Sequence, residues 1–522
     1  MRPRHLAVIV FVIALVASIV PASADAGPLE PLCPVLDDLG LSGLIGCETD
    51  ADGDGVTIAD GDCDDTDPTI YPGAPDEPDL GFVDSNCDDI DGTAAEAIFL
   101  APSGHDSYPG TMAEPVATFA HAIALAEAQG KDIYAQAGTY GPGSITTDDL
   151  GVFGGYGPTW ARASSYSTVI AGAPQAVLVT GAGGVGLQLL GLQSSAAAGH
   201  ASAYGLRAVN AGVDLERVSV TAGAPLDGIA GPPGGLGSDG ATGANGMPGS
   251  CDSNVTAAGG TGGGIGSGVR AGGTGGSGRN ADNGAPGSPG GGGASGGFGG
   301  SSGNLGQPGG NGAPGANGPA GASGSGGSNA PGVAGSMWSG QAGGIGANGL
   351  PGHGGGGGGA GGGQSGFLVD DGTGNGGGGG GAGAAGGSGG SGGIAGGGSF
   401  GLFLINSDVT VADGTTIAAG NGGRGGNGAP GGPGGAGGGG GGGASHCTDE
   451  VGRGGNGGAG GNGGAGGAGG GGAGGPSIGV LRTAGGSLSV LGSPAPTFGA
   501  GGAGGSGVNA GQPGMTGSIV AV

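Results

Sequence analysis

Closely spaced carboxylates are the residues of this chain best placed to do chemistry. Between Asp37 and Glu96 there are 19 Asp or Glu residues and no Lys, Arg or His. Several of the aspartates alternate with glycine, which supplies the backbone conformation that a tight turn needs when it points carboxylates at one ion. Ligands that are oxygen atoms alone favour a hard cation such as calcium over zinc or copper(II). The spacing therefore predicts calcium ligands at Asp50, Asp52, Asp54, Asp60, Asp62, Asp64, Asp65, Asp67, Asp84, Asn86 and Asp88.

The first of these loops, from Asp50 to Gly55, is not a complete EF-hand. An EF-hand loop places Glu at its twelfth position, where this chain has Gly61. We expect the stretch from Asp60 to Asp67 to supply the second half of the site. The alternative interpretation is a disordered acidic linker. It is the weaker interpretation because glycines are interleaved with the aspartates and the segment contains two cysteines.

These residues resemble a known family. The runs Asp50 to Gly55, Asp60 to Asp65, Tyr71 to Ala74 and Asn86 to Asp88 are similar to the MopE-type metal-binding motif of exported myxobacterial and other deltaproteobacterial proteins. The resemblance covers residues 48–92 and implies metal binding, with calcium at the Asp loops. It does not extend to a further cysteine that family repeats carry after Pro-Gly-Ala. On this resemblance we pair Cys63 with Cys87 and, by exclusion, Cys33 with Cys47.

The N-terminus has the features of an export signal. Arg2 and Arg4 precede an apolar run from Leu6 to Val20, and Ala22 to Ala24 has the form of a signal-peptidase site. We expect a signal peptide over residues 1–24 and a secreted, extracellular or outer-surface bacterial protein. Six cysteines in an exported chain predict disulfides rather than thiol chemistry.

The charge balance limits the partners. The chain has 11 Lys or Arg against 39 Asp or Glu, a formal net charge of −28. Such a chain will not bind nucleic acid through phosphates and should repel anionic membranes. No second apolar span follows the first, so we expect no integral membrane segment. Divalent cations are the expected partners, together with extracellular polysaccharide or self-association.

A second resemblance begins directly after the acidic segment. The stretch from Gly104 to Tyr140 is similar to the entry of a pectin-lyase-like right-handed parallel β-helix. Thr118 can cap a helix that Gly130 ends, and such a helix would cover the open end of a β-solenoid. Short apolar runs separated by glycine then predict strands at 132–135, 152–156, 168–171, 177–180 and 185–192.

Three later segments align as successive coils of one solenoid. They run from Tyr204 to Gly223, from Phe400 to Gly420 and from Ile478 to Gly501. After each of these segments a glycine-rich stretch, here called an excursion, leaves the coil at the same place. Because coils stack on one another, the excursions should also stack. Cys251 lies in the first excursion and Cys447 in the second, and we expect a disulfide between them.

Glycine supplies 157 of the 522 residues and recurs at every third position through the excursions. A period of three is typical of polyproline-II geometry, which has no internal hydrogen bonds, so its backbone must bond to neighbouring strands or water. Three interpretations stay open: disordered linkers, a collagen triple helix over Gly228–Gly249, and a bundle of polyglycine-II-like strands. Residues 454–475 also resemble the glycine-rich repeats of mycobacterial surface proteins, in composition alone.

The resulting expectation is an all-β chain: a right-handed parallel β-helix with one N-terminal capping helix, polyglycine-II-like excursions and an Asp-rich calcium module. We expect a calcium-binding structural or adhesive protein without catalytic activity. The alternatives are a polysaccharide lyase or hydrolase, which would rest on fold analogy, and an ice- or ligand-binding glycine-rich surface. The candidate enzyme residues on the coils are Arg207, Arg217, Asp214 and Glu216, which we interpret as a solvated strand face. The expected domains are the signal peptide (1–24), a linker (25–47), the metal-binding module (48–92), the first coils (96–223), an excursion (224–398), a coil (399–420), an excursion (421–476) and the last coil (477–522).

Overall fold

The computed structural model describes residues 50–197, 202–252, 256–263, 270–292, 302–330, 332–366, 369–483 and 485–522. The expected signal peptide, the expected linker and the expected Cys33–Cys47 pair lie outside these residues. The chain divides into two units. The first contains the described residues up to 139 together with 150–168 and 188–190, and the second contains 140–149, 169–187 and 191–522.

Parallel β-structure dominates the described residues, in agreement with an all-β class. In the part of the chain that the structure describes, one α-helix and two 3-10 turns accompany the strands. The elements are η3 (Ile58–Asp60), η4 (Ala94–Glu96), β1 (Ala97–Leu100), α3 (Phe119–Gln129), β2 (Asp132–Gln136), β3 (Gly138–Tyr140), β4 (Gly143–Ile145), β5 (Gly151–Tyr156), β6 (Thr168–Gly172), β7 (Gln175–Thr180), β8 (Val185–Gln188), β9 (Leu190–Ser194), β10 (Ala203–Val209), β11 (Gly212–Glu216), β12 (Ser219–Ala222), β13 (Val333–Ala334), β14 (Met337–Trp338), β15 (Gln364–Gly366), β16 (Val369–Gly372), β17 (Ser399–Ile405), β18 (Asp408–Val411), β19 (Thr416–Ala419), β20 (Ser477–Arg482), β21 (Leu488–Val490) and β22 (Thr516–Ala521).

In the first unit, β1, β2 and β5 form a parallel ladder beside helix α3. The Thr118 side chain accepts a hydrogen bond from the His121 N–H, and Gly130 ends the helix in the left-handed conformation, as the sequence predicted. The helix buries Phe119, Ala122, Ile123 and Ala126, the apolar face expected for a cap.

A buried arginine joins the acidic segment to this ladder. The Arg162 guanidinium donates to the Asp91 carboxylate at 2.9 Å and to the Asp79 carbonyl at 2.9 Å, and its Nε donates to the Gly154 carbonyl at 2.9 Å. Neither side chain of the Arg162–Asp91 pair is exposed by more than 2%. Such a pair is costly to break because it would leave one buried charge unpaired. It therefore fixes the end of the acidic segment against β5.

In the second unit, the expected coils are in register. Tyr204 of β10 pairs with Phe400 of β17, which pairs with Ile478 of β20. The ladder β4–β7–β10–β17–β20–β22 is parallel, as are β11–β18–β21 and β9–β12–β19. The sequence alignment was wrong at one point: it ended the last two coils at Gly420 and Gly501, whereas the bridge between Ala418 and Thr497 brings Gly420 opposite Gly499. It also did not anticipate β22.

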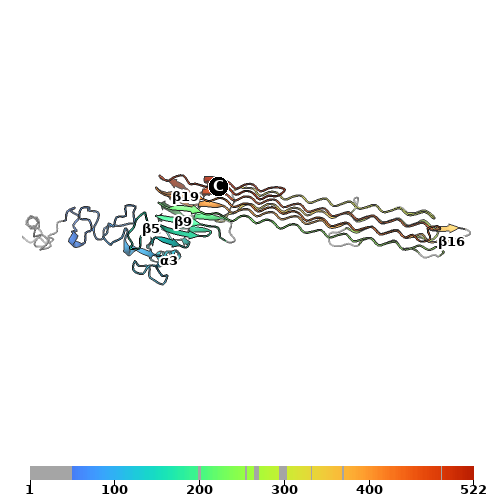
Figure 1. Ribbon diagram of the computed structural model, residues 1–522, viewed down its shortest axis with the longest axis horizontal. Coiled ribbons are helices and arrows are strands. Elements are labelled where there is room, and N and C mark those ends of the chain that lie inside the picture. The colour runs from blue at the N-terminus through green and yellow to red at the C-terminus, as the bar shows by residue number, and fades with distance from the viewer. Residues whose placement is uncertain are drawn as a thin grey trace, which may run out of the picture. The chain divides into compact units, whose positions relative to one another are not determined.

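The described glycine-rich segments are ordered by hydrogen bonds to one another. Figure 1 shows them running side by side from the region of β19 to β16. Residues 373–397, here the central segment, bond to 226–249, 256–263, 270–279, 341–363, 421–444 and 452–475.

Three successive amides of the central segment donate in three directions. The Gly376, Gly377 and Gly378 N–H groups donate to the carbonyls of Met247, Gly276 and Gly455, at 3.0, 3.0 and 2.9 Å. The pattern then repeats with a period of three. Every residue from Gly376 to Gly381 is glycine, and a Cβ atom at any of them would lie within 2.2 Å of a neighbouring backbone carbonyl oxygen.

Asparagine and aspartate side chains bond to amides that do not face a neighbouring carbonyl. Asp239 Oδ1 accepts from the Ala436 N–H at 2.7 Å, and Asn245 Oδ1 accepts from the Gly442 N–H at 2.7 Å. Asn456 and Asn462 do the same for Gly443 and Gly437. These bonds satisfy a backbone donor that the period-three pattern leaves over, and they favour one register between neighbours.

Candidate metal centre

Two loops of the acidic segment share one backbone conformation. In the first, the Asp50 carboxylate accepts from the N–H groups of Gly53 and Gly55, at 2.6 and 3.0 Å. Both glycines have positive φ, 87° and 99°. Glycine adopts that region without a steric cost, so the sequence Asp50 to Gly55 folds into this turn readily.

The second loop repeats the turn without glycine. The Asp84 carboxylate accepts from the N–H groups of Asp88 and Asp89, at 3.1 and 2.8 Å. Cys87 and Asp89 take the two positive φ values, 58° and 77°. Both residues pay a steric cost in this conformation that glycine would not. The loop therefore adopts this turn despite the steric cost of positive φ at two non-glycine residues.

The first loop gathers carboxylates around one point. Asp50, Asp52 and Asp54 each offer an oxygen, and these oxygens lie within 4.8 Å of one another. One oxygen of Asp52 accepts from the Asp54 N–H at 3.1 Å, and one oxygen of Asp54 accepts from the Val56 N–H at 2.8 Å. The other oxygen, Oδ2, of both residues is buried and has no hydrogen-bond donor.

Asp62 adds a third oxygen of this kind. Its Oδ1 accepts from the Asp64 N–H at 2.9 Å, whereas its Oδ2 is buried without a donor, and the residue is 4% exposed. Desolvation raises the pKa of Asp52, and the charges of Asp54, Asp50 and Asp62 raise it further. Buried carboxylate oxygens that lack donors cost free energy unless a cation neutralises them. This donor set of oxygen atoms fits calcium.

The stretch from Asp60 to Asp67 reaches the first loop through Asp65, whose Oδ1 accepts from the Ala51 N–H at 3.2 Å. The other carboxylates of the stretch bond within their own turns. Asp60 accepts from Thr57, Asp64 from Thr66 and Asp67 from Thr69. Asp62 and Asp65 are thus the members of this stretch that adjoin the first loop.

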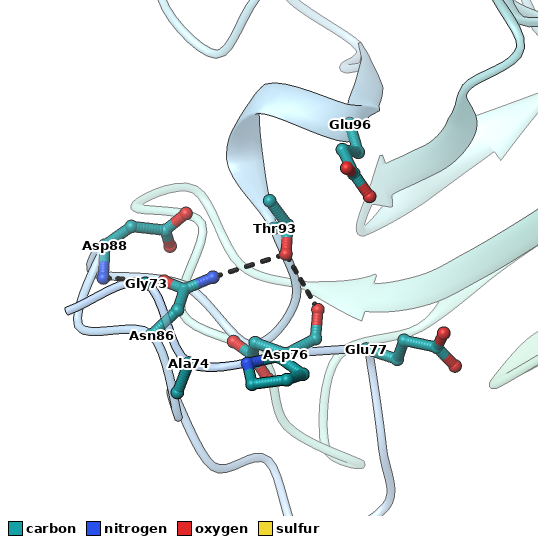
Figure 2. Close-up of a pocket in the computed structure, with 9 residues that line it drawn as sticks. Gly73, Ala74, Asp76, Glu77, Asn86, Asp88, Thr93 and Glu96 are labelled. Atoms are coloured by element: carbon teal, nitrogen blue, oxygen red, sulfur yellow. Dashed lines mark hydrogen bonds between the residues drawn. The ribbon is translucent and has the colours of Figure 1, made fainter. Parts of the chain in front are cut away.

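The second loop borders a separate cavity of about 530 Å³ (Figure 2). The Asn86 amide donates to Thr93 Oγ1 at 3.4 Å, and that hydroxyl donates to the Asp76 carbonyl at 2.9 Å. Desolvation raises the pKa of the buried Asp76 to about 6, although its carboxylate accepts from the Gly92 N–H. The walls are Gly73, Ala74, Pro75, Asp76, Glu77, Asn86, Asp88, Thr93 and Glu96.

The predicted ligands therefore occupy two places. Asp84, Asn86 and Asp88 belong to the second loop and its cavity, with Asn86 and Asp88 in the wall. Sequence analysis did not include Asp76, Glu77 or Glu96 among the site residues. They stand outside the Asp-x-Asp spacing, and only folding brings them to the cavity.

Two disulfides support these arrangements. Cys63 and Cys87 are joined, with their Cα atoms 5.8 Å apart, and this bond ties the segment after the first loop to the second loop. In the second unit Cys251 is joined to Cys447 across a sequence separation of 196 residues. Both pairs are those expected from the sequence.

The candidate enzyme residues do not gather on one strand, which corrects the sequence interpretation. Arg207 lies on β10 and is 5% exposed, with its guanidinium 5.8 Å from the Tyr204 ring centre. Asp214 and Glu216 lie on β11, and Arg217 follows it. Two histidines have side-chain partners: His105 contacts Ser107 at 2.8 Å, and His353 contacts Arg270 at 2.7 Å.

No described helix is both long enough and apolar enough to cross a lipid bilayer. No protein-family model matches the sequence. A search of curated proteins finds no match either. Among solved structures, a GH136 lacto-N-biosidase from Eubacterium ramulus is similar over 24% of this chain and 27% of its own, with 9% identity and a TM-score of 0.19. A similarity at that level carries no argument about fold or activity.

Proposed function

We propose that this chain is an exported, calcium-binding structural or adhesive protein of the bacterial surface or extracellular matrix, without catalytic activity. The observation that carries the proposal is the set of three buried carboxylate oxygens without donors, on Asp52, Asp54 and Asp62. Asp52 and Asp54 belong to the cluster whose oxygens lie within 4.8 Å of one another, and the charge of Asp62 acts on Asp52. The segment that contains them has no Lys, Arg or His. A cation is the simplest group that would offset their mutual repulsion.

Calcium suits this set better than a transition metal. The ligands are carboxylate oxygens on flexible turns, and calcium accepts six to eight oxygens in irregular geometry. Asp50, Asp52, Asp54 and Asp62 would hold the ion, with Asp65 beside them. The Asp84 loop and its cavity would provide a second, weaker place for a cation, because all four carboxylate oxygens of Asp84 and Asp88 already accept backbone hydrogen bonds.

The structural part of the proposal rests on the second unit. Its parallel ladders are consistent with a right-handed β-helix, and its glycine-rich segments with a polyglycine-II-like bundle. A bundle held by backbone hydrogen bonds on many sides is suited to bearing load or presenting a surface.

Calcium uptake by the full chain should depend on the carboxylates without donors. We expect calorimetric titration to show binding that the double substitution Asp52→Asn and Asp62→Asn weakens at least about tenfold, since two ligand charges are lost. The matched control is Asp239→Asn, whose oxygen accepts a backbone hydrogen bond that asparagine can also accept. Equal calcium affinity in the double variant and the control would contradict the assignment.

The structural function predicts binding without turnover. Incubated with a panel of acidic and neutral polysaccharides, the calcium-loaded chain should release no reducing ends or unsaturated products. Retention on one of these polymers would support an adhesive function. Depolymerisation of any of them would overturn the proposal in favour of a polysaccharide-active enzyme.

A further inference from the structure

A column of inward side chains runs through the longest ladder of the second unit and ends exposed. Val177, Leu206, Leu402 and Val480 follow one another in register, and each is 0% exposed. The next member, Ile519 of β22, is 47% exposed. The interior of the coils is therefore open at β22.

The ladder of β11, β18 and β21 ends in the same way. Leu215 and Val411 are 0% and 1% exposed, whereas Val490, which pairs with Val411, is 38% exposed. Two neighbours in the last coil, Leu491 and Phe498, are 56% and 45% exposed. Apolar side chains on this face thus lie in water where their counterparts one coil earlier are buried.

Among the residues that the structure describes, nothing pairs with the backbone of this face on one side. β21 and β22 are terminal strands of their sheets, bonded to β18 and β20 respectively. Natural proteins protect such edges with charges or proline. Neither strand contains a charged residue or a proline, and no charged residue lies between Arg482 and the last residue, Val522.

We infer that this face, formed by β21, β22, Leu491 and Phe498, is an interface between two copies of the chain. A two-fold axis beside β22 would set the two copies of that strand antiparallel, so that their free N–H and C=O groups bond to each other. The exposed apolar residues of the last coil would then be buried between the copies.

Charge favours a second copy as the partner. Two chains of net charge −28 repel each other over most of their surfaces. None of the forty residues after Arg482 has a charged side chain, so this face permits close approach with the least repulsion. Because salt screens the remaining repulsion but not burial of apolar surface, association should strengthen as the NaCl concentration rises.

Sedimentation velocity of the full chain over a range of protein concentrations tests this interface. We expect a monomer–dimer equilibrium that Ile519→Lys weakens at least about tenfold, because lysine places a charge in the contact. The matched control is Ile229→Lys on a glycine-rich segment, where the isoleucine is 70% exposed. This control should leave the dissociation constant unchanged.

A second variant separates loss of the interface from loss of folding. Leu491→Glu changes a residue outside the strands and should also weaken the dimer. At protein concentrations low enough for both chains to be monomeric, its thermal unfolding midpoint should equal that of the unsubstituted chain. A chain that stays monomeric at every concentration and salt level would overturn the inference. So would an Ile229→Lys variant that dissociates as readily as Ile519→Lys, because the contact would then lie on the bundle.

Discussion

Replacing Gly438 or Gly440 with alanine should lower the free energy of unfolding, whereas replacing Gly439, between them, should not. A Cβ atom at Gly438 would lie 2.0 Å from the Ala241 carbonyl oxygen, and one at Gly440 would lie 2.0 Å from the Gly457 carbonyl oxygen. The nearest atom to a Cβ at Gly439 is a methyl group of Thr242, 3.8 Å away. All three residues belong to one uninterrupted glycine run, so they differ only in which neighbour they face.

The expected losses at Gly438 and Gly440 are about 1–3 kcal/mol or more, since backbone carbonyls cannot move aside as a flexible side chain can. At Gly439 the change should be neutral or favourable by up to about 1 kcal/mol, because alanine restricts the unfolded chain. Denaturant unfolding of the three variants measures this alternation. Similar destabilisation by all three would mean that the segment is not held in the period-three arrangement.

Deleting residues 227–397 should remove the bundle but leave the parallel ladders folded. The deleted part begins just after β12 and ends just before β17, and these two points are close together. The Ser399 hydroxyl donates to the carbonyls of Ala222 and Gly223, at 3.3 and 3.0 Å. A short linker can therefore reconnect β12 and β17, and loop-closure entropy changes slowly with length. The variant should also carry Cys447→Ser, because its disulfide partner Cys251 is removed.

This deletion is expected to lower stability without unfolding the coils. It removes the β13–β14 hairpin, whose Trp338 packs 5.8 Å from the Phe400 ring. Loss of a buried tryptophan from a core costs about 3–5 kcal/mol. Circular dichroism should retain strand signal, and amide exchange should accelerate over 421–476, which loses the central segment. Cooperative collapse of the whole chain would show that the bundle is part of the core.

The sequence predicted those features that depend on local chemistry or on repetition. Thr118 and Gly130 mark the helix because a cap and a left-handed stop are local requirements. The coils could be aligned because the run from Tyr204 repeats at Phe400 and Ile478, and stacked coils place like residues together. The expected stacking of the excursions and the expected Cys251–Cys447 pair followed from that alignment.

Features that depend on contacts between residues far apart in the sequence could not be predicted. Arg162 looks like an ordinary surface arginine, and only the approach of Asp91 and the Asp79 carbonyl makes it a buried clamp. Asp76 has no place in the Asp-x-Asp spacing, yet burial raises its pKa to about 6. β22 escaped notice because a preceding glycine-rich stretch separates it from the repeat that revealed the other coils.

The pairing of the glycine-rich segments also sets the order in which the chain can fold as it is made. Gly228 donates to Arg424, 196 residues later, and the Ile229 carbonyl accepts from Ile394. At a synthesis rate of roughly 5–20 residues per second, the first segment waits about 10–40 s for its later partner. During that interval the stretch from 224 to 398 has no complete set of neighbours. Its scarcity of large apolar residues is then an advantage, since a chain that cannot collapse stays available until the last strand emerges.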